Sequence, residues 1–369
     1  MTRKGWCPGA LRPMPAGDGL LLRVRPHGSR LDPAQVVGLA EIAEIFGNGQ
    51  VDLGSRATLQ LRGVGNEALP EVQRRLVALG LLDANPRREA RRNFMVTPFW
   101  RAGDGTTDLV RGLEEALRDA PDLPPKFGFA IDTGSRAALQ DASADLRIER
   151  AGDGLLLRAD GMAWGERVTP GTVIPRLAEV LDWFAASGHG RMAQAIGEGL
   201  KPPLLEDAAP DRQGLRQDLL RAAPFLFAPF GAATAGALRD LAGHGLRLTP
   251  WRAVLPEGDL HSALWLTDPE APLLRVSACT GAPGCSSASV ATRALARQLA
   301  PHVPAGRHLH VSGCAKGCAH PDPASITLTG REGRFDLIRN GRAGDEPSRR
   351  GLTTTDIADM MRGHLGAQL

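Results

Sequence analysis

Four cysteines in two closely spaced pairs constrain this sequence more than any other feature. The first pair lies in SACTGAPGC, with five residues between Cys279 and Cys285, and the second lies in SGCAKGC, with three residues between Cys314 and Cys318. Twenty-eight residues separate the pairs, so a fold that uses them together must bring two loops to one place. Both loops are rich in glycine, which lets the backbone approach a bound group closely.

Three interpretations of these cysteines differ in chemistry. Four thiolates are the usual ligand set of a [4Fe–4S] cluster, which is the interpretation we favour. Structural zinc sites prefer pairs with about two to four intervening residues, so the observed spacings fit zinc poorly. Ordinary reduced cysteines are the third alternative. The segment after Cys285, SSASVATRALARQL, predicts a helix whose N-terminus would stabilise the negative charge of a cluster.

The fifth cysteine, Cys7 in GWCPG, lies far from the two pairs. We interpret it as a small buried residue in a tight turn rather than as a ligand or a redox group. The first residues lack the apolar stretch of a secretory signal, and no apolar run approaches the roughly 20 residues that span a bilayer. We therefore expect a cytoplasmic protein, where thiols stay reduced. The net charge of +3 gives no reason to expect a nucleic acid or a membrane as partner.

Two long stretches of the chain resemble each other. Residues 20–64 read as strand, helix and a second strand over 51–64. Residues 225–255 repeat that order and end in a strand over 246–255. In each half a further strand, a strand pair with a glycine-bearing turn and a helix follow, the helices spanning 173–186 and 355–364. This pattern predicts an internal duplication with a period of about two hundred residues, which is typical of a pseudo-twofold protein.

The repeat predicts an α+β fold of four parts. Residues 1–85 and 215–266 would form two strand–helix–strand half-domains. Residues 86–200 and 267–369 would form two α/β domains, the second of which carries the four cysteines. A linker rich in proline, glycine and charge, GEGLKPPLLEDAAPDRQG, would join the halves.

The cysteine loops resemble those of the sirohaem-dependent sulfite and nitrite reductases, in which such pairs hold a [4Fe–4S] cluster coupled to sirohaem. The resemblance covers most of the chain and implies a pseudo-twofold duplicated fold with ferredoxin-like half-domains and two α/β domains. In the N-terminal half, LLLRVRP, SRATLQLRG, RRNFMVTP and PPKFGF resemble further segments of this superfamily. These segments supply the candidate substrate-binding residues Arg23, Arg25, Arg56, Gln60, Arg92 and Lys126.

Physical chemistry gives an independent reason to expect that these arginines bind the substrate. Because side chains alternate along a strand, Arg23 and Arg25 share one face, and Arg56, Thr58 and Gln60 share a face of the next strand. A tetrapyrrole with up to eight carboxylates needs many fixed cations, and the guanidinium binds carboxylate bidentately without losing its charge. The simpler alternative is a set of surface arginines in an arginine-rich chain.

Departures from the reductase pattern indicate another branch of the superfamily. Gly128 stands where the reductases have the second lysine of a Lys-Phe-Lys segment, and the second cysteine loop continues as SGCAKGCAHP. With the opening KGWCPGALRPMPAGDGLLLRVRP, these features look like the cobalamin-pathway branch, the precorrin-3B synthases. That resemblance implies O2-dependent hydroxylation of precorrin-3A at C-20 with formation of a γ-lactone. It also implies a [4Fe–4S] cluster, a mononuclear non-haem iron as a further candidate cofactor, and an external electron donor such as an NADH-linked reductase, a ferredoxin or a flavodoxin.

Two other functions stay open. A sulfite or nitrite reductase would hold sirohaem as a cofactor, whereas an iron–sulfur electron carrier or sensor would need no cationic tetrapyrrole cavity. His308, His310 and His320 flank the second cysteine pair, and we interpret them as structural rather than as catalytic or iron-binding residues. Lys316, between two cysteines, would either raise the potential of a cluster or point to solvent. Asp18 is interpreted as a turn residue.

Overall fold

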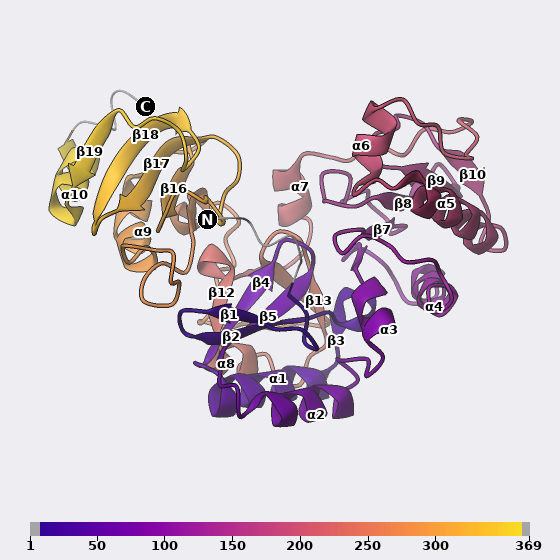
Figure 1. The fold of residues 1–369 in the computed structure, drawn as a ribbon, viewed down its shortest axis with the longest axis horizontal. Coiled ribbons are helices and arrows are strands. Elements are labelled where there is room, and N and C mark those ends of the chain that lie inside the picture. The colour runs from indigo at the N-terminus through magenta and orange to yellow at the C-terminus, as the bar shows by residue number, and fades with distance from the viewer. Residues whose placement is uncertain (1–7, 364–369) are drawn as a thin grey trace.

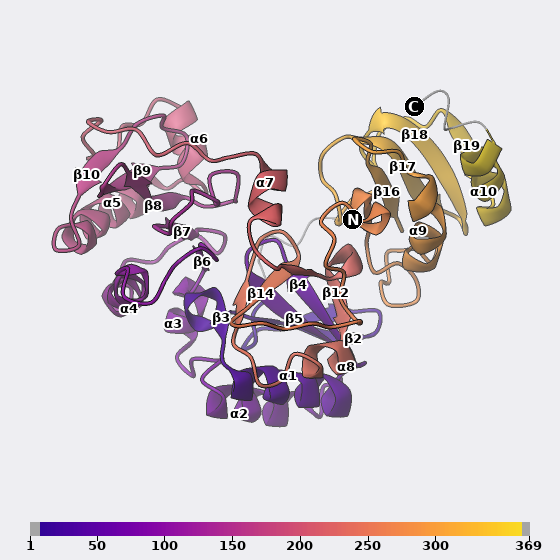
Figure 2. The same ribbon diagram turned by 180° about the vertical axis from the view of Figure 1, so that it is seen from behind.

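The computed structural model describes residues 8–363, which form a central lobe and two α/β lobes. Four β-sheets organise these residues, two of them in the central lobe and one in each α/β lobe. The two α/β lobes stand on either side above the central lobe, as the front and back views show (Figures 1 and 2). Cys7 lies outside the described residues.

The two central sheets are antiparallel, and each receives one strand from the other half of the chain. The first has the strand order β1-β2-β5-β4-β12, and the second has the order β11-β14-β13-β3. The strands of the first sheet are β1 (Met14–Ala16), β2 (Gly19–Val24), β5 (Thr58–Val64), β4 (Gln50–Gly54) and β12 (Ala232–Thr234). The strands of the second are β11 (Leu226–Phe227), β14 (Ala253–Pro256), β13 (Leu246–Leu248) and β3 (Arg30–Leu31).

This strand exchange is symmetric and reveals the duplication. Leu31 of β3 pairs with Leu246 of β13, and in the other half Ala233 of β12 pairs with Val51 of β4. A helix starts directly after a capping residue at the end of each exchanged strand, α1 (Pro33–Phe46) after the first and α8 (Ala235–Arg239) after the second. The predicted pseudo-twofold fold is therefore confirmed, and the exchange ties the halves together.

The two α/β lobes repeat one another strand for strand. Their sheets have the orders β10-β9-β8-β7-β6 and β15-β16-β17-β18-β19, each with parallel pairing at one end and antiparallel pairing at the other. The first lobe contains β6 (Phe94–Val96), β7 (Phe129–Asp132), β8 (Leu146–Ala151), β9 (Gly154–Ala159) and β10 (Glu166–Val168). The second contains β15 (Val276–Ala278), β16 (Leu309–Ser312), β17 (Ala324–Arg331), β18 (Arg334–Gly341) and β19 (Arg349–Leu352).

Helices cover one face of each sheet. Both central sheets share one apolar core with α1 and α8, which includes Leu22, Leu39, Leu238 and Leu246. The α/β lobes have separate cores. The remaining helices are α2 (Leu69–Ala78), α3 (Pro86–Arg91), α4 (Thr106–Ala116), α5 (Val173–Ser187), α6 (Met192–Gly197), α7 (Arg216–Arg221), α9 (Arg293–Leu299) and α10 (Thr354–Gly363). No helix within residues 8–363 is long and apolar enough to cross a membrane.

Three local predictions were wrong. The stretch 51–64, predicted as one strand, is a hairpin that turns at Ala57 with φ 50°, and 246–255 likewise turns at Arg252 with φ 60°. The helix predicted directly after Cys285 begins only at Arg293, so residues 286–292 separate it from that cysteine. Alternating apolar residues fit one long strand as well as two short ones, and only pairing across the turn distinguishes them.

Candidate cluster and substrate site

The two cysteine loops follow neighbouring parallel strands of the second α/β lobe. Cys279 and Cys285 lie in the loop after β15, and Cys314 and Cys318 lie in the loop after β16. Because the carboxyl ends of parallel neighbours lie at one edge of a sheet, the loops meet there. The backbone N–H of Gly313 donates to the Cys279 sulfur at 3.2 Å, which joins one loop to the other.

Close backbone packing holds the two loops together. A Cβ at Gly313 would stand 2.6 Å from the Cβ of Ala288, so a larger residue there would force the loops apart. The Gly313 carbonyl accepts a hydrogen bond from the Ser289 N–H at 3.1 Å. The Thr292 hydroxyl donates to the Cys279 carbonyl at 2.6 Å. The glycines that marked these loops in the sequence therefore serve loop-to-loop contact.

Cys318 lies within electrostatic range of the other three thiols. Burial raises the pKa of Cys318, and the charges of Cys314, Cys279 and Cys285 raise it further, while Lys316 opposes them. Within residues 8–363 no three His, Cys, Asp or Glu side chains stand at the spacing that holds a metal ion. The fit to a [4Fe–4S] cluster therefore rests on the donor set, four soft thiols on two glycine-rich loops at one sheet edge. Cys318 is exposed and the other three are half-buried.

An ion pair of the central lobe lies directly beneath the first cysteine loop. Arg62 of β5 binds Asp18 through two contacts and also donates to the Gly284 carbonyl at 3.1 Å. A Cβ at Gly17 would stand 2.8 Å from the Pro283 carbonyl oxygen, so the turn between β1 and β2 touches the loop as well. Asp18 is a turn residue, as predicted, but Arg62 was missed because its partners are far away in the sequence.

The three histidines pack against one another behind the second cysteine loop. The rings of His308 and His320 stack with centroids 4.4 Å apart, and those of His310 and His320 meet edge-on at 5.7 Å. His308 shares a 2.9 Å hydrogen bond with the Ser277 hydroxyl, whereas neither ring nitrogen of the buried His310 has a partner among the described residues. Burial, and then the neighbouring His320, lowers the pKa of both His308 and His310 to about 4, so both rings are neutral at physiological pH.

Two predicted substrate-binding arginines are already paired with a carboxylate. Arg25 and Arg92 both contact Glu89, at 3.3 Å and 2.5 Å, and all three side chains are buried. Arg92 also lies 2.6 Å from His27 Nε2. Burial lowers the pKa of Arg25, with Glu89 opposing this effect and Arg23 adding to it. Glu89 thus offsets one of the two positive charges of Arg25 and Arg92 within the protein.

The other predicted substrate-binding residues make different contacts. Arg56 donates to the Lys126 carbonyl at 3.1 Å and to the Ser143 hydroxyl at 3.3 Å, which joins the central lobe to the first α/β lobe. Lys126 is exposed. Arg23 pairs in register with Gln60 across β2 and β5, and its buried Nε has no partner among the described residues.

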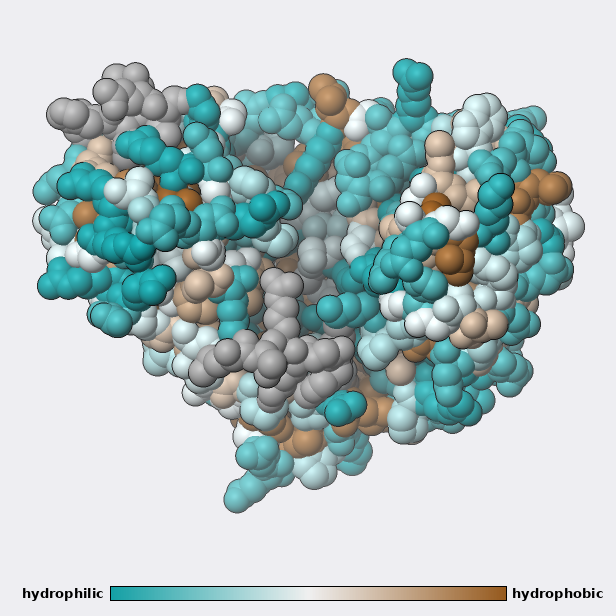
Figure 3. All heavy atoms as spheres, turned by 45° about the horizontal axis from the view of Figure 1, so that its top comes forward, coloured by the Kyte–Doolittle hydropathy of each residue, from teal (hydrophilic) through white to brown (hydrophobic). Residues whose placement is uncertain are grey.

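Two cavities lie beside Arg25 and Arg92, and a hollow opens between the α/β lobes. A cavity of about 360 Å³ is lined by Arg25, Phe127 and Phe129 among others, and one of about 120 Å³ is lined by Arg92 and His27 among others. Arg23, Arg56, Gln60 and Lys126 line neither cavity. The hollow between the lobes is visible in Figure 3, with hydrophilic side chains along it.

Gly128 leaves no room for the side chain that the reductases carry. A Cβ there would stand 2.8 Å from the Asn93 Nδ2, which is itself held by a 2.7 Å hydrogen bond to the Phe127 carbonyl. The Gly128 N–H donates to Asp145 at 3.0 Å. A lysine could enter this position only if Asn93 moved.

Comparison with known proteins identifies similar sequences and a similar fold. The family described as nitrite/sulfite reductase ferredoxin-like half domain matches residues 12–79. A precorrin-3B synthase of Sinorhizobium is 30% identical, over 94% of this chain and 85% of its own length. A ferredoxin–nitrite reductase of Synechococcus elongatus is 26% identical, over 95% of this chain and 86% of its own length. The structure of the Mycobacterium tuberculosis NirA protein superposes with a TM-score of 0.64 at 20% identity, covering 93% of this chain and 79% of that one.

Proposed function

Because the chain belongs to the precorrin-3B synthase family of the sulfite/nitrite reductase superfamily, we propose that it hydroxylates precorrin-3A at C-20, with formation of a γ-lactone, in cobalamin biosynthesis. Membership of this family makes the chain an enzyme of the oxidoreductase class. In the proposed reaction one atom of O2 enters the substrate and the other leaves as water, with two electrons and two protons taken from an external donor. The likeness to this family over nearly the whole chain carries the proposal.

The four cysteines would hold a [4Fe–4S] cluster that supplies electrons for the reaction. Cys318 is exposed, and so is Lys316, whose ammonium donates to the Ser287 hydroxyl at 2.9 Å. An external donor protein or reductase would approach here, because electron transfer requires a short distance to the cluster and this edge faces solvent. Free thiols must be available to build the cluster, and they persist in the reducing cytoplasm, where we place the protein.

The substrate would lie in the hollow between the two α/β lobes. Arg23 and Lys126 are the predicted cations without a carboxylate partner among the described residues, so they remain available to bind substrate carboxylates. Arg56 would orient the segment that carries Lys126 through its 3.1 Å hydrogen bond to the Lys126 carbonyl. Arg25 and Arg92 share the single carboxylate of Glu89, so together they would shape the wall and contribute one net positive charge rather than two.

Aerobic and anaerobic incubation with precorrin-3A tests this proposal. The full chain, with its cluster reconstituted and an electron donor present, should add the mass of one oxygen atom to the substrate only when O2 is supplied. Isotopically labelled O2 should place the label in the product. Oxygen that came from water, or no gain of mass under O2, would contradict the proposal.

A nitrite or sulfite reductase is the second candidate, since the Synechococcus relative carries that activity in its name. Gly128 argues against it, because such reductions need fixed cations around a small oxyanion and each missing one can cost about a hundredfold in rate. We therefore expect poor nitrite and sulfite reduction, even with a strong artificial donor. Rapid reduction together with the strong discrete absorption bands of sirohaem would favour the reductase.

A further inference from the structure

Cys279 is held through both its backbone and its sulfur by three residues that lie near it. Its N–H donates to the Val311 carbonyl at 3.4 Å, and its carbonyl accepts from the Thr292 hydroxyl at 2.6 Å. Its sulfur accepts from the Gly313 N–H at 3.2 Å. Among residues 8–363, no other sulfur of the four paired cysteines accepts a hydrogen bond. Cys279 is therefore the cysteine whose position and charge the protein controls most directly.

Tight packing fixes the Gly313 N–H at this distance from the sulfur. A Cβ at Gly313 would stand 2.6 Å from the Ala288 Cβ and 3.3 Å from the Gly281 Cα, so glycine suits this position better than any larger residue. Gly313 is buried, and its carbonyl accepts from the Ser289 N–H at 3.1 Å. The donor therefore cannot turn away from the sulfur unless the contact between the two loops breaks.

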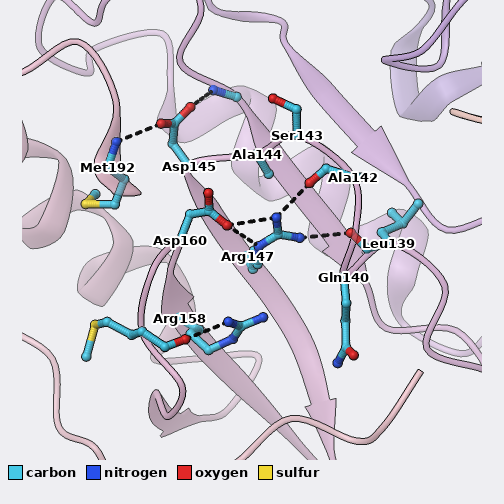
Figure 4. Close-up of polar contacts among 12 residues, drawn as sticks. Leu139, Gln140, Ala142, Ser143, Ala144, Asp145, Arg147, Arg158, Asp160 and Met192 are labelled. Carbon is cyan, nitrogen blue, oxygen red and sulfur yellow. Dashed lines mark hydrogen bonds and ion pairs between the residues drawn. The ribbon is translucent and has the colours of Figure 1, made fainter. Parts of the chain in front are cut away.

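The first α/β lobe shows how the same position is built where no cysteine is present. Thr133 follows β7 as Gly313 follows β16, and its hydroxyl shares a 2.8 Å hydrogen bond with that of Thr106. A buried arginine braces the loop that continues from there, since Arg147 donates to the Leu139 carbonyl at 2.8 Å (Figure 4). Side chains thus close the loops of this lobe. A backbone N–H aimed at a sulfur is a feature of the cysteine lobe alone.

A hydrogen bond to a cluster ligand has a direct effect on the reduction potential. Reducing an iron–sulfur cluster adds a negative charge, so an N–H that donates to one of its sulfur ligands favours the reduced state and raises the potential. The bond acts strongly here because Gly313 is buried and Cys279 is half-buried. Lys316 is exposed, where water and salt screen its charge, and its ammonium already binds the Ser287 hydroxyl.

We propose that the Gly313 N–H is a positioning donor that holds Cys279 as a cluster ligand and raises the reduction potential of the cluster. This inference rests on the [4Fe–4S] cluster of the proposed function. A higher potential lets a reductant of moderate strength, such as an NADH-linked reductase, supply the electrons. The glycine of the second cysteine loop thereby influences which electron donor the enzyme can use.

An anaerobic redox titration of the reconstituted full chain, followed by the electron paramagnetic resonance of the reduced cluster, tests this role. Gly313→Ala forces the loops apart and weakens the hydrogen bond. Its equilibrium constant for reduction should fall about tenfold, which is about 59 mV for one electron. Adding Ala288→Gly removes the methyl group that the new Cβ would meet, so the double variant should recover most of this loss.

Gly344→Ala is the matched control beside the same loop. Its Cβ would stand 3.4 Å from the Ala315 carbonyl oxygen, which is an ordinary contact, so the potential should equal that of the wild type. An equal fall in Gly344→Ala would overturn the proposal, because the effect would then come from a general loosening of the loop. An intact cluster with the wild-type potential in Gly313→Ala would also overturn it.

The outcomes separate this inference from the proposed function. A wild-type chain that holds no iron and sulfide after reconstitution would overturn both, whereas hydroxylation is scored separately by the incubation with precorrin-3A. A measurement on the wild type keeps the test decisive even where Gly313→Ala loses its cluster. After exchange into D2O, electron–nuclear double resonance of the reduced cluster should show a coupled deuteron from the Gly313 amide. The absence of any such coupling would contradict the hydrogen bond.

Discussion

Arg62 and Asp18 form a two-point ion pair beneath the first cysteine loop, with Nη2 to Oδ1 at 3.0 Å and Nε to Oδ2 at 3.1 Å. Their side chains are only 7% and 15% exposed. The same Nη2 donates to the Gly284 carbonyl, 222 positions along the chain and next to Cys285. The position of a cluster ligand in the second half therefore depends on a charge pair built in the first.

Breaking this pair should weaken both the fold and the cluster. Arg62→Leu leaves Asp18 sheltered without its partner, and loss of one member of a buried pair typically costs about 3 kcal/mol. We expect a lower urea midpoint of unfolding and faster loss of iron to a chelator. Arg111→Ala, which removes an exposed pair with Asp108, should change the midpoint little. Iron loss at the wild-type rate in Arg62→Leu would show that the pair does not position the loop.

Each of the four paired cysteines should be required for the cluster. Replacing Cys279, Cys285, Cys314 or Cys318 by serine substitutes a hard hydroxyl for a soft thiolate and should remove or destabilise the cluster. Iron and sulfide content of the purified variants measures the effect. Cys7→Ser is the internal control and should retain full iron content. A clear loss of iron in that variant would make Cys7 a ligand or a support of one.

The predicted substrate-binding arginines and lysine should separate into two classes by the effects of replacing them with alanine. Arg23→Ala and Lys126→Ala should raise the KM for precorrin-3A while the unfolding midpoint changes little, because no carboxylate among the described residues pairs with either cation. Arg92→Ala should instead lower stability by about 3 kcal/mol, since it leaves the buried Glu89 with one partner fewer. Steady-state kinetics and urea unfolding on the same preparations distinguish the classes. A normal KM for Arg23→Ala and Lys126→Ala would contradict their role in binding.

Asp132 should make the protein less stable as the pH rises from about 4 to about 6. Its carboxyl is 2% exposed, and burial raises its pKa from 3.8 to about 6, opposed by hydrogen bonds from the Leu139 and Ala138 N–H groups. In that window the folded state holds a proton that the unfolded state has lost, so the free energy of unfolding falls as pH rises. The full effect is about 3 kcal/mol.

The variant Asp132→Asn removes this titration. We expect it to be more stable than the wild type in urea at neutral pH and to show a smaller advantage near pH 4. Asp122→Asn is the contrasting control, because Asp122 is exposed and its pKa is lowered, mainly by Arg87, so it should bring no gain at neutral pH. A difference between Asp132→Asn and the wild type that is constant with pH would contradict the prediction.

Local patterns in the sequence were sufficient to predict these helices, the glycine turns and the duplication. The helix predicted over 173–186 is observed as Val173–Ser187, and that over 355–364 as Thr354–Gly363. The glycine turns of both strand pairs are observed, with φ of 65° at Gly152 and 77° at Gly333. Periodicity and glycine placement report on neighbours within a few residues, which is the range over which such elements form.

By itself, the sequence determined the repeated order of elements, the two cysteine loops and the family to which they belong. Only the tertiary structure decided that β3 and β12 change sheets, that Glu89 binds both Arg25 and Arg92, and that Arg62 reaches the Gly284 carbonyl of the first cysteine loop. The physical reason is that the charge available at a site depends on which groups pack beside it. Those groups are brought together across dozens to hundreds of positions by sheet pairing and burial, which leave no periodic signal along the chain.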